Sequence, residues 1–364
     1  MATTSYGVNA PEAVKLWSRK LAHEIKKATY IDRFIGESAD SLIQAKNDTK
    51  KGPGDRITVT LRMLLSGDGV MGDSTLENNE ESLTTYTDNV VINQMRHAVR
   101  SQGKMSEQRI PFSYREEAKD GLVQWWAERM DQVFFNQICG YTPANTAVGG
   151  SGMSGTGPTY QGSNTILAPT AGRKKFAGSA TADEGLASSD LFNLSVIDKA
   201  VEAAKVATPM IRPVRYKGQM YYVMFLHPYQ VTDLRTTTST GQWLDIQKAA
   251  MTGGMVQDNP IFTGSLGIYN NVILHEAFRV TQGVNSSTGA AISTVRRAVL
   301  CGAQTGFIAF GQGSGFKEME WNEKLFDYGN QLGVKAGSIF GIKKAQFNSV
   351  DFGTITVSTY AAAH

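Results

Sequence analysis

The sequence predicts an α+β fold organised by a long two-stranded loop and a long helix. Extended and helical segments occur in mixed order, without the regular strand and helix alternation of a doubly wound parallel sheet. The stretch from Asp55 to Arg100 has the pattern of two long polar strands, and the stretch from Phe112 to Ile138 carries large apolar residues at helical spacing. With 41% hydrophobic and 19% charged residues, the composition excludes a chain that is disordered throughout.

Residues 1–50 are expected to form an N-terminal arm that contains one amphipathic helix. Asn9 is a good helix cap, and Pro11 suits the first turn. Trp17 and Leu21 lie on its apolar face, which must dock either on its own domain or on a neighbouring subunit. We expect Trp17 and Leu21 to make an inter-subunit contact.

The same helix carries a stripe of cations. Its basic residues are Lys15, Arg19, Lys20, Lys26 and Lys27. This stripe could contact phosphate or an acidic partner, or it could be an ordinary solvated helix face. The formal net charge of +3 is close to balanced, which argues against a dedicated nucleic-acid-binding protein.

Residues 51–105 are expected to form the extended loop. After the break at residues 50–55, Ile57, Val59 and Leu61 alternate with polar residues, and a returning strand covers Leu83 to Arg100. A two-stranded hairpin of this length is only marginally stable alone in water. With few apolar side chains of its own, the loop is expected to lie on another molecule.

The end of this loop, from Ser66 to Ser82, is rich in turns and acidic. The residues expected to take part in an inter-subunit contact are Glu77, Glu80 and Glu81 at the end of the loop, and Arg96 and Arg100 near its base. An acidic end on one subunit against a basic patch on the next would fix their register.

Residues 106–207 are expected to form a domain around the long helix, which Gly140 ends. Residues 141–189 have no periodicity and many glycines, and this stretch is interpreted as an exposed insertion or a mobile loop. Asp190 is expected to cap the next helix.

Residues 208–334 and 335–364 are expected to be two further parts of the chain. A strongly apolar strand covers Met220 to Leu226, and short helices are expected through Val231 and Leu234 and at residues 242–251. Further strands are expected at residues 267–275, 297–301, 307–310 and 354–358.

Motifs of enzyme chemistry are weak or absent, and no catalytic residue, cofactor or metal is expected. Residues 67–72 match G-x-G-x-x-G, but the acidic segment that follows is a poor helix opening for a pyrophosphate. The five histidines are scattered, and Cys139 and Cys301 are expected to be buried free thiols of a reducing compartment. No signal peptide or membrane span is recognisable, so the cytoplasm is the expected compartment.

The order of parts resembles the major capsid proteins of tailed bacteriophages, which have the Hong Kong 97 fold. Four stretches are similar in sequence to the coliphage N-four-like branch of that family: NAPEAVKLWSRKLAHEI, RIPFSYREEAKDGLVQWWAERMDQVFF, YYVMFLHPYQVTDL and NPIFTGSLGIYNNVILHEA. The resemblance covers nearly the whole chain. It implies an N-terminal arm (residues 1–50), an extended β-hairpin loop (51–105), a peripheral domain with a spine helix (106–207), an axial domain (208–334) and C-terminal peripheral strands (335–364).

The resemblance also implies a structural protein whose copies assemble into pentamers and hexamers of an icosahedral head around double-stranded DNA. It implies assembly in the bacterial host cytoplasm, with a portal and a decoration protein as partners. Because only about fifty residues precede the loop, a separate scaffolding protein is expected. An encapsulin-like compartment shell, another virion protein or, less favoured, an enzyme with an unrecognised site stay open as alternatives.

Overall fold

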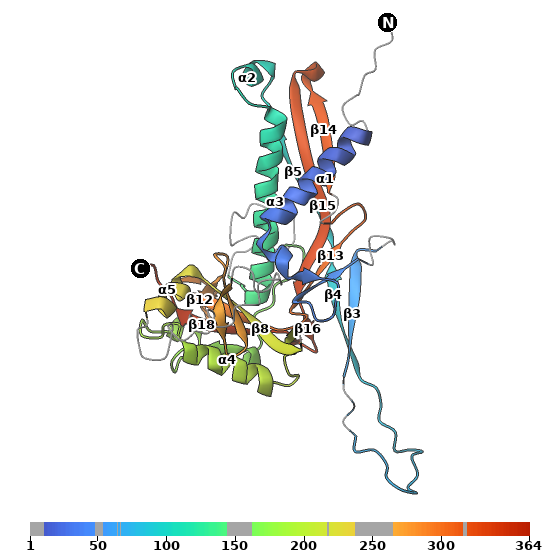
Figure 1. Cartoon of the computed structure of the whole chain (residues 1–364), viewed down its shortest axis with the longest axis vertical. Helices are drawn as coiled ribbons and strands as arrows, with labels where there is room; N and C mark the ends of the chain where they lie inside the picture. Colours follow the sequence, from blue (N-terminus) through green and yellow to red (C-terminus); the bar gives the residue numbers. More distant parts are fainter. Residues whose placement is uncertain are drawn as a thin grey trace.

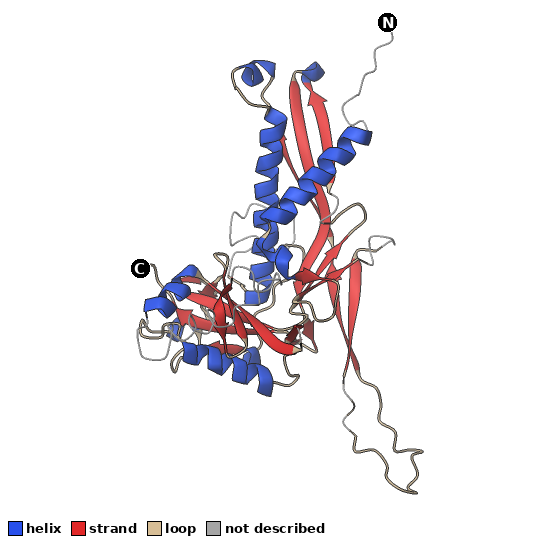
Figure 2. Ribbon diagram, viewed as in Figure 1, coloured by secondary structure: helices blue, strands red, loops and turns tan. Residues whose placement is uncertain are grey.

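The structure, a computed structural model, describes residues 11–47, 54–63, 65, 67–143, 162–216, 218–236, 265–315 and 319–364, with side chains of the first helix from Trp17 onward. Figure 1 shows an elongated part, a rounder part beside its lower end, and the extended loop projecting away from both. Helices pack against the faces of two separate sheets (Figure 2), which confirms the predicted α+β class.

The described residues form five α-helices. They are α1 (Pro11–Ala28), α2 (Lys104–Gln108), α3 (Tyr114–Cys139), α4 (Leu194–Val206) and α5 (Pro228–Thr236). Gly140 ends α3 in the left-handed conformation with φ of 61°, which glycine adopts without steric cost. The bounds of α3 therefore agree with the predicted helix to within two residues at each end.

The start of α4 differs from the prediction. Its N-cap is Asn193, whose side chain accepts a hydrogen bond from the Val196 backbone N–H at 3.2 Å. Asp190 does not cap the helix because its carboxylate accepts from the Ala187 N–H at 2.9 Å in the preceding turn. Residues 1–10 and the helix expected at residues 242–251 lie outside the described residues.

A six-stranded sheet runs along α3 in the elongated part. Its path is β1 (Ile35–Gly36), β2 (Ile43–Lys46), β13 (Gly306–Phe310), β15 (Gln331–Lys344) and β14 (Glu320–Phe326), and β5 (Asn93–Arg100) also pairs with β15. The 14-residue β15 therefore pairs with three strands from three parts of the chain. Side chains of α1, α3 and this sheet share one core with Phe225 and Val299 of the second sheet.

An eight-stranded mixed sheet forms the rounder part. Its path is β6 (Lys174–Phe176), β18 (Thr354–Tyr360), β12 (Ala291–Cys301), β8 (Gln219–Leu226), β10 (Val272–Glu276) and β9 (Ser265–Tyr269), with β11 (Gln282–Val284) on β12 and β7 (Val214–Tyr216) on β8. Apolar residues of α4 and α5 pack on this sheet and form a second core.

The grouping of strands differs from the predicted division of the chain. β13 and β14 fall within residues 208–334 but join the six-stranded sheet, whereas β18 falls within residues 335–364 but pairs with β12 in the eight-stranded sheet. The predicted boundaries at 208 and 335 follow sequence order. The sheets instead combine strands that are distant in sequence.

The extended loop begins as a two-stranded ladder. β3 (Arg56–Arg62) pairs with β4 (Thr85–Val91) from Arg56 opposite Val91 to Arg62 opposite Thr85. The returning strand predicted from Leu83 to Arg100 is two strands, because β4 stops at Val91 and β5 continues in the six-stranded sheet. Two short strands, β16 (Gln346–Phe347) and β17 (Val350–Asp351), pair beside the base of the loop.

The glycine-rich stretch is not simply an exposed insertion. Residues 144–161 lie outside the described part, but residues 162–189 pack onto both halves of the molecule. Asp183 is 1% exposed, and its carboxylate accepts hydrogen bonds from the Arg297 guanidinium and from the Val284 N–H. Low periodicity here reflects anchoring by individual polar side chains, which leaves no repeating pattern in the sequence.

Candidate interaction surfaces

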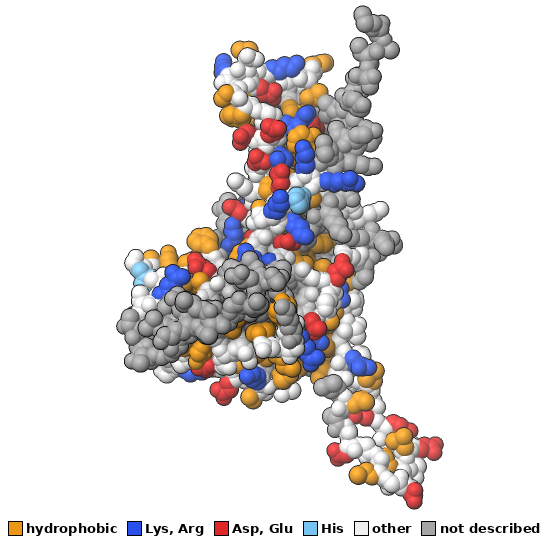
Figure 3. Space-filling view, in the orientation of Figure 1, with side chains coloured by type: hydrophobic (Ala, Val, Ile, Leu, Met, Phe, Trp, Pro, Cys, Tyr) orange, Lys and Arg blue, Asp and Glu red, His pale blue; other side chains and the backbone are white. Residues whose placement is uncertain are grey.

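The end of the extended loop (residues 65–83, the loop end below) combines exposed apolar and acidic side chains. Four large apolar residues are each more than half exposed: Leu65 (65%), Met71 (85%), Leu76 (60%) and Leu83 (58%). From Met63 to Thr87 the chain has five acidic residues and no Lys or Arg. Figure 3 shows these red and orange side chains on the segment that stands farthest from the rest of the molecule. Because these side chains project from the body of the molecule, we treat the loop end as a candidate contact surface.

The loop end has the geometry of a turn-rich tip. Gly69 and Gly72 have φ of 72° and 63°, which only glycine adopts readily, and the Glu81 carboxylate accepts from the Gly67 N–H at 2.7 Å. In the described residues no helix begins directly after Gly72, and no Lys or Arg lies between Met63 and Thr87 to pair with a phosphate.

The base of the loop behaves differently from its end. Ile57, Val59 and Val90 are buried against Phe307 and Phe347 of the same chain. The expectation that the extended loop has few apolar side chains and lies on another molecule is therefore wrong for the base of the loop, which packs on its own chain. Only the loop end is left without such a partner among the described residues.

The predicted basic residues lie on β5. Arg96 and Arg100 are exposed, and the Arg100 guanidinium lies 4.2 Å from the centre of the Phe326 ring. The loop end and this patch lie toward opposite ends of the molecule (Figure 1), so the predicted acidic and basic groups do not meet within one chain. Contact between two subunits therefore stays a prediction for Glu77, Glu80, Glu81, Arg96 and Arg100.

An aromatic and basic cluster extends the β5 surface onto α3. The His97 ring stacks on Trp125 with centroids 4.4 Å apart, and the Arg129 guanidinium lies 5.4 Å from the Trp125 ring centre. Burial, and then the nearby Arg129 charge, lower the pKa of His97. His97 is thus held in its neutral form more strongly than a free histidine.

The N-terminal helix uses its apolar face within its own chain. Leu21 and Ile25 are at most 1% exposed in the main core, and Trp17 stacks on Trp321 of β14 with ring centroids 5.7 Å apart. The predicted inter-subunit contact of Leu21 is therefore wrong, because its side chain is fully buried in its own chain. Trp17 is only half buried, so its inter-subunit contact stays a prediction. A continuous apolar stripe found a complementary surface on the same domain, which was the other alternative for this helix.

The cations of α1 lie on the opposite, solvent-facing side of that helix. Arg19, Lys20, Lys26 and Lys27 are exposed, and the side chain of Lys15 lies outside the described part. Lys20 Nζ is 5.3 Å from the Trp17 ring centre, and Lys26 Nζ is 3.9 Å from Asp32 Oδ1. The structure therefore gathers these four charges on one accessible surface.

Two buried ion-pair groups have no counterpart in the sequence-based prediction. Lys174, Asp183 and Arg297 form the first, and Lys344 with Asp351, whose Nζ and Oδ1 are 2.8 Å apart, forms the second. Burial raises the pKa of Asp183, but the Arg297 guanidinium, hydrogen bonds to the carboxylate and the charge of Lys174 together outweigh it and leave that pKa below its ordinary value. These charges fasten loop segments to strands, and no local sequence signal distinguishes them from surface charges.

The thiols and histidines show no arrangement for catalysis. Burial raises the pKa of both Cys139 and Cys301, which keeps the thiols protonated and unreactive. Burial and Arg296 lower the pKa of His227 to about 4. Within the described ranges no three His, Cys, Asp or Glu side chains come together as metal ligands, and no helix is both long and apolar enough to cross a bilayer.

Comparison with known proteins gives one consistent result. A family model described as phage capsid protein matches residues 4–363. The major capsid protein of Pseudomonas phage KPP25 is 31% identical over an alignment of 385 positions, which covers 99% of this chain and 98% of that protein.

Solved structures agree with this result. The capsid of Ralstonia phage GP4 has a TM-score of 0.80 and 33% identity, over 100% of this chain and 99% of that chain. The capsid of cyanophage Pam1 has a TM-score of 0.68 and 22% identity, over 93% of each chain, and so supports the fold alone.

Proposed function

Because this chain belongs to the phage capsid protein family and is a major capsid protein, a structural component of the virion rather than an enzyme, we propose how its copies assemble. The fold is of the Hong Kong 97 type. Membership in the coliphage N-four-like branch stays a prediction. Copies of the chain form pentamers and hexamers of an icosahedral head that encloses double-stranded DNA.

The two sheets support an assignment of domains within this fold. α3 with the six-stranded sheet would be the spine and peripheral domain, and the eight-stranded sheet with α4 and α5 would be the axial domain. β18 then belongs to the axial domain, and β13 and β14 belong to the peripheral domain. This assignment replaces the boundaries drawn from sequence order.

One observation carries the assembly proposal: the loop end exposes Leu65, Met71, Leu76 and Leu83 at the end of an outstretched ladder. A second copy of the chain would cover these side chains and present Arg96 and Arg100 to the acidic residues. Several modest contacts of this kind per subunit would add to a strong assembly, because each holds the others at high effective concentration.

Charge reversal tests this contact. We expect the triple variant Glu77→Lys, Glu80→Lys and Glu81→Lys to fold normally and to lose shell formation, as seen by negative-stain imaging and sedimentation. Adding Arg96→Glu and Arg100→Glu to the same chain should restore shells, because the two charge patterns are then exchanged. Glu202→Lys on α4, also exposed, is the matched control and should assemble normally. Normal shells from the triple variant would contradict the proposed contact.

The remaining partners follow from the family and from the charge of α1. Arg19, Lys20, Lys26 and Lys27, with Lys15, would face packaged DNA and bind its phosphates without reading sequence. A separate scaffolding protein, a portal and a decoration protein are proposed partners on the family premise alone, as is assembly in the bacterial host cytoplasm. No specific observation favours an encapsulin-like compartment shell.

A further inference from the structure

The extended loop changes its pairing partner at a single residue. β4 pairs with β3 up to Val91, and β5 pairs with β15 from Asn93, which lies opposite Phe340. Ile92 lies between the two strands. The ladder of β5 with β15 ends at Asn93, and the backbone N–H and C=O of Val91 bond the Asn164 side chain instead.

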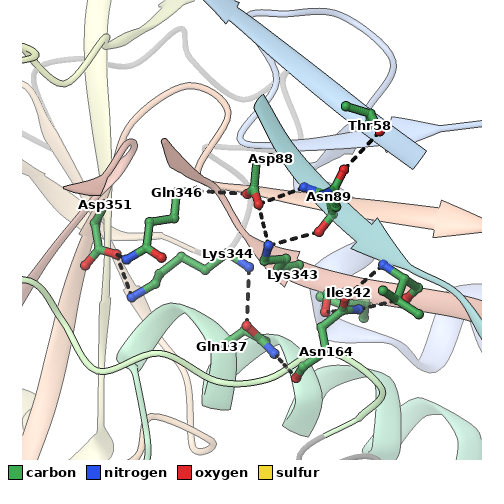
Figure 4. Close-up of polar contacts among 11 residues, drawn as sticks. Thr58, Asp88, Asn89, Gln137, Asn164, Ile342, Lys343, Lys344, Gln346 and Asp351 are labelled. Atoms are coloured by element: carbon green, nitrogen blue, oxygen red, sulfur yellow. Dashed lines mark hydrogen bonds and ion pairs between the residues drawn. The ribbon is translucent and has the colours of Figure 1, made fainter. Parts of the chain in front are cut away.

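The Asn164 side chain occupies this gap (Figure 4). Its Oδ1 accepts from the Val91 N–H at 2.9 Å, and its Nδ2 donates to the carbonyls of Val91 at 2.9 Å and Ile342 at 3.2 Å. Asn164 is 4% exposed, so these bonds are shielded from water. Its own backbone carbonyl accepts from Gln137 Nε2 of α3 at 2.8 Å, which ties the amide to the spine helix.

Asp88 holds the next part of β4 to β15 and to the turn that follows it. This carboxylate, on a residue that is 6% exposed, accepts from Lys343 Nζ and from the Gln346 N–H at 3.1 Å. Lys343 Nζ also donates to the Asn89 carbonyl at 2.9 Å. Figure 4 shows Asp88, Asn89 and Lys343 gathered together, with Asn164 beside Ile342 of the same strand.

We propose that Asp88, Asn164 and Lys343 are positioning residues that form a loop-base latch, which fixes the direction of the extended loop and so determines where the loop end reaches on a second copy. This inference rests on the proposed role of the loop end. The apolar contact at the base is not directional, whereas hydrogen bonds and charge-assisted contacts hold only over a narrow range of distance and angle.

The length of the loop makes its direction important. From Val91 to Glu77 the chain spans at most about 45 Å at roughly 3.3 Å per residue. A rotation of about 5° at the base would therefore displace the loop end by about 4 Å, enough to separate an ion pair formed at contact distance.

The test is a distance measurement in the full chain. Spin labels at Glu77→Cys and Lys205→Cys, both exposed, report the distance between the loop end and α4, and the buried Cys139 and Cys301 should not react. Excess unlabelled protein makes contact between two labelled subunits rare, so the measured distances arise within one chain. We expect Asn164→Ala and Lys343→Met each to broaden the distance distribution at least two-fold. Thr58→Ala, which removes a 2.9 Å bond to Asn89 inside the loop, is the control and should leave it unchanged.

Each outcome decides the proposal. Distributions of equal width in wild type, Asn164→Ala and Lys343→Met would overturn it, as would shells of native size and yield from a variant whose distribution is broad. If Asn164→Ala unfolds, Lys343→Met decides, because it keeps the aliphatic stem. Charge reversal limited to Glu80→Lys and Glu81→Lys leaves position 77 for the spin label and should keep the native width, so failure of the proposed contact is distinguishable from failure of the latch.

Discussion

The N-terminal helix α1 and the loop end both present large apolar side chains, yet they are covered in different ways. Leu21 and Ile25 of α1 are buried in the main core of their own chain. Leu65, Met71, Leu76 and Leu83 of the loop end stay more than half exposed. In α1 the apolar residues recur at helical spacing and form one stripe, whereas in the loop end they are separated by turns and acidic residues.

The difference distinguishes folding from assembly. A regular apolar stripe stabilises the single chain, because it fits a neighbouring surface during folding. Scattered exposed apolar residues on an outstretched ladder contribute little to the single chain and are free for a second copy. Variants in the two regions should therefore separate stability from assembly.

The largest effect is expected at the core of α1. Leu21→Ala should lower the free energy of unfolding by about 3 kcal/mol, because it removes buried methyl groups and leaves a cavity. Leu76→Ala at the loop end should change that free energy by no more than about 0.5 kcal/mol. Urea denaturation of unassembled protein measures both. Equal effects at the two positions would remove the contrast.

Asp131, which contacts the residues that follow α1, is expected to change the free energy of unfolding with pH by about 1 to 3 kcal/mol. Asp131 of α3 accepts the N–H groups of Tyr30 and Ile31 at 3.0 and 3.1 Å, and burial raises its pKa to about 6. Between the unfolded pKa near 4 and about 6 the folded chain binds the extra proton, so stability falls as the pH rises through this range.

Asp131→Asn tests that effect. The variant should lack this part of the pH dependence when free energies of unfolding are compared from pH 4 to pH 7. Parallel profiles for wild type and variant would show that Asp131 does not titrate in this range. The loop-end variant Glu80→Gln serves as control and should follow the wild-type profile, since its side chain is exposed.

A smaller effect is expected from the stacked rings of α1 and β14. Trp17→Ala should lower the free energy of unfolding by about 1 kcal/mol, because it removes the contact with Trp321 on a half-buried surface. Trp17→Phe should keep most of that stability. Thermal unfolding of both variants measures the difference, and a neutral Trp17→Ala would indicate that α1 is held by Leu21 and Ile25 alone.

The smallest stability effect and a distinct binding effect are expected from the exposed charges. Replacing Arg19, Lys20 and Lys27 by Gln should change stability by no more than about 0.5 kcal/mol. It should reduce the salt dependence of binding to a double-stranded oligonucleotide by about 0.9 in slope for each phosphate that the variant no longer neutralises. Replacing Glu77, Glu80 and Glu81 by Gln should leave the slope unchanged. Equal slopes for wild type and the α1 variant would contradict a DNA-facing helix.

Sequence reasoning succeeded where a pattern repeats locally. The helix ended by Gly140, the apolar strand β8 and the ladder of β3 with β4 follow from helical or alternating spacing. The exposure of the loop end follows from its turns and acidic residues. The apolar stripe of α1 was recognised as well, but spacing alone does not say whether the covering surface belongs to the same chain.

The bounds of the longest strand did not follow from local pattern, although strands were expected within residues 335–364, and the reason is physical. β15 contains Gly333, Gly337 and Gly341, and glycine ordinarily disfavours strands. A Cβ at Gly341 would lie 2.1 Å from the Val91 carbonyl oxygen, and one at Gly337 would lie 2.7 Å from Glu320 Oε2. These glycines permit close approach of the neighbouring strands. For Gly341 that neighbour is β4, which is distant in sequence, so its role is visible only after folding.

Residues 162–189 were misread for a related reason. Asn164 and Asp183 each make specific buried contacts with residues more than seventy positions away along the chain. Single polar anchors leave no periodic trace, and the sequence resembles that of a solvated loop. The latch and the buried ion pairs therefore could not be predicted from local pattern.

The pairing of β5 with β15 has a mechanical consequence for a closed shell. β5 lies alongside β15 over eight residue pairs, from Arg100 opposite Gly333 to Asn93 opposite Phe340, and it continues directly from the base of the loop (Figure 1). Tension applied to the loop by a neighbour would pull β5 lengthwise and load the hydrogen bonds of this ladder together, rather than opening them one after another. A strand that merely continues the fold would thereby serve as the tether through which one subunit resists being drawn away from the next.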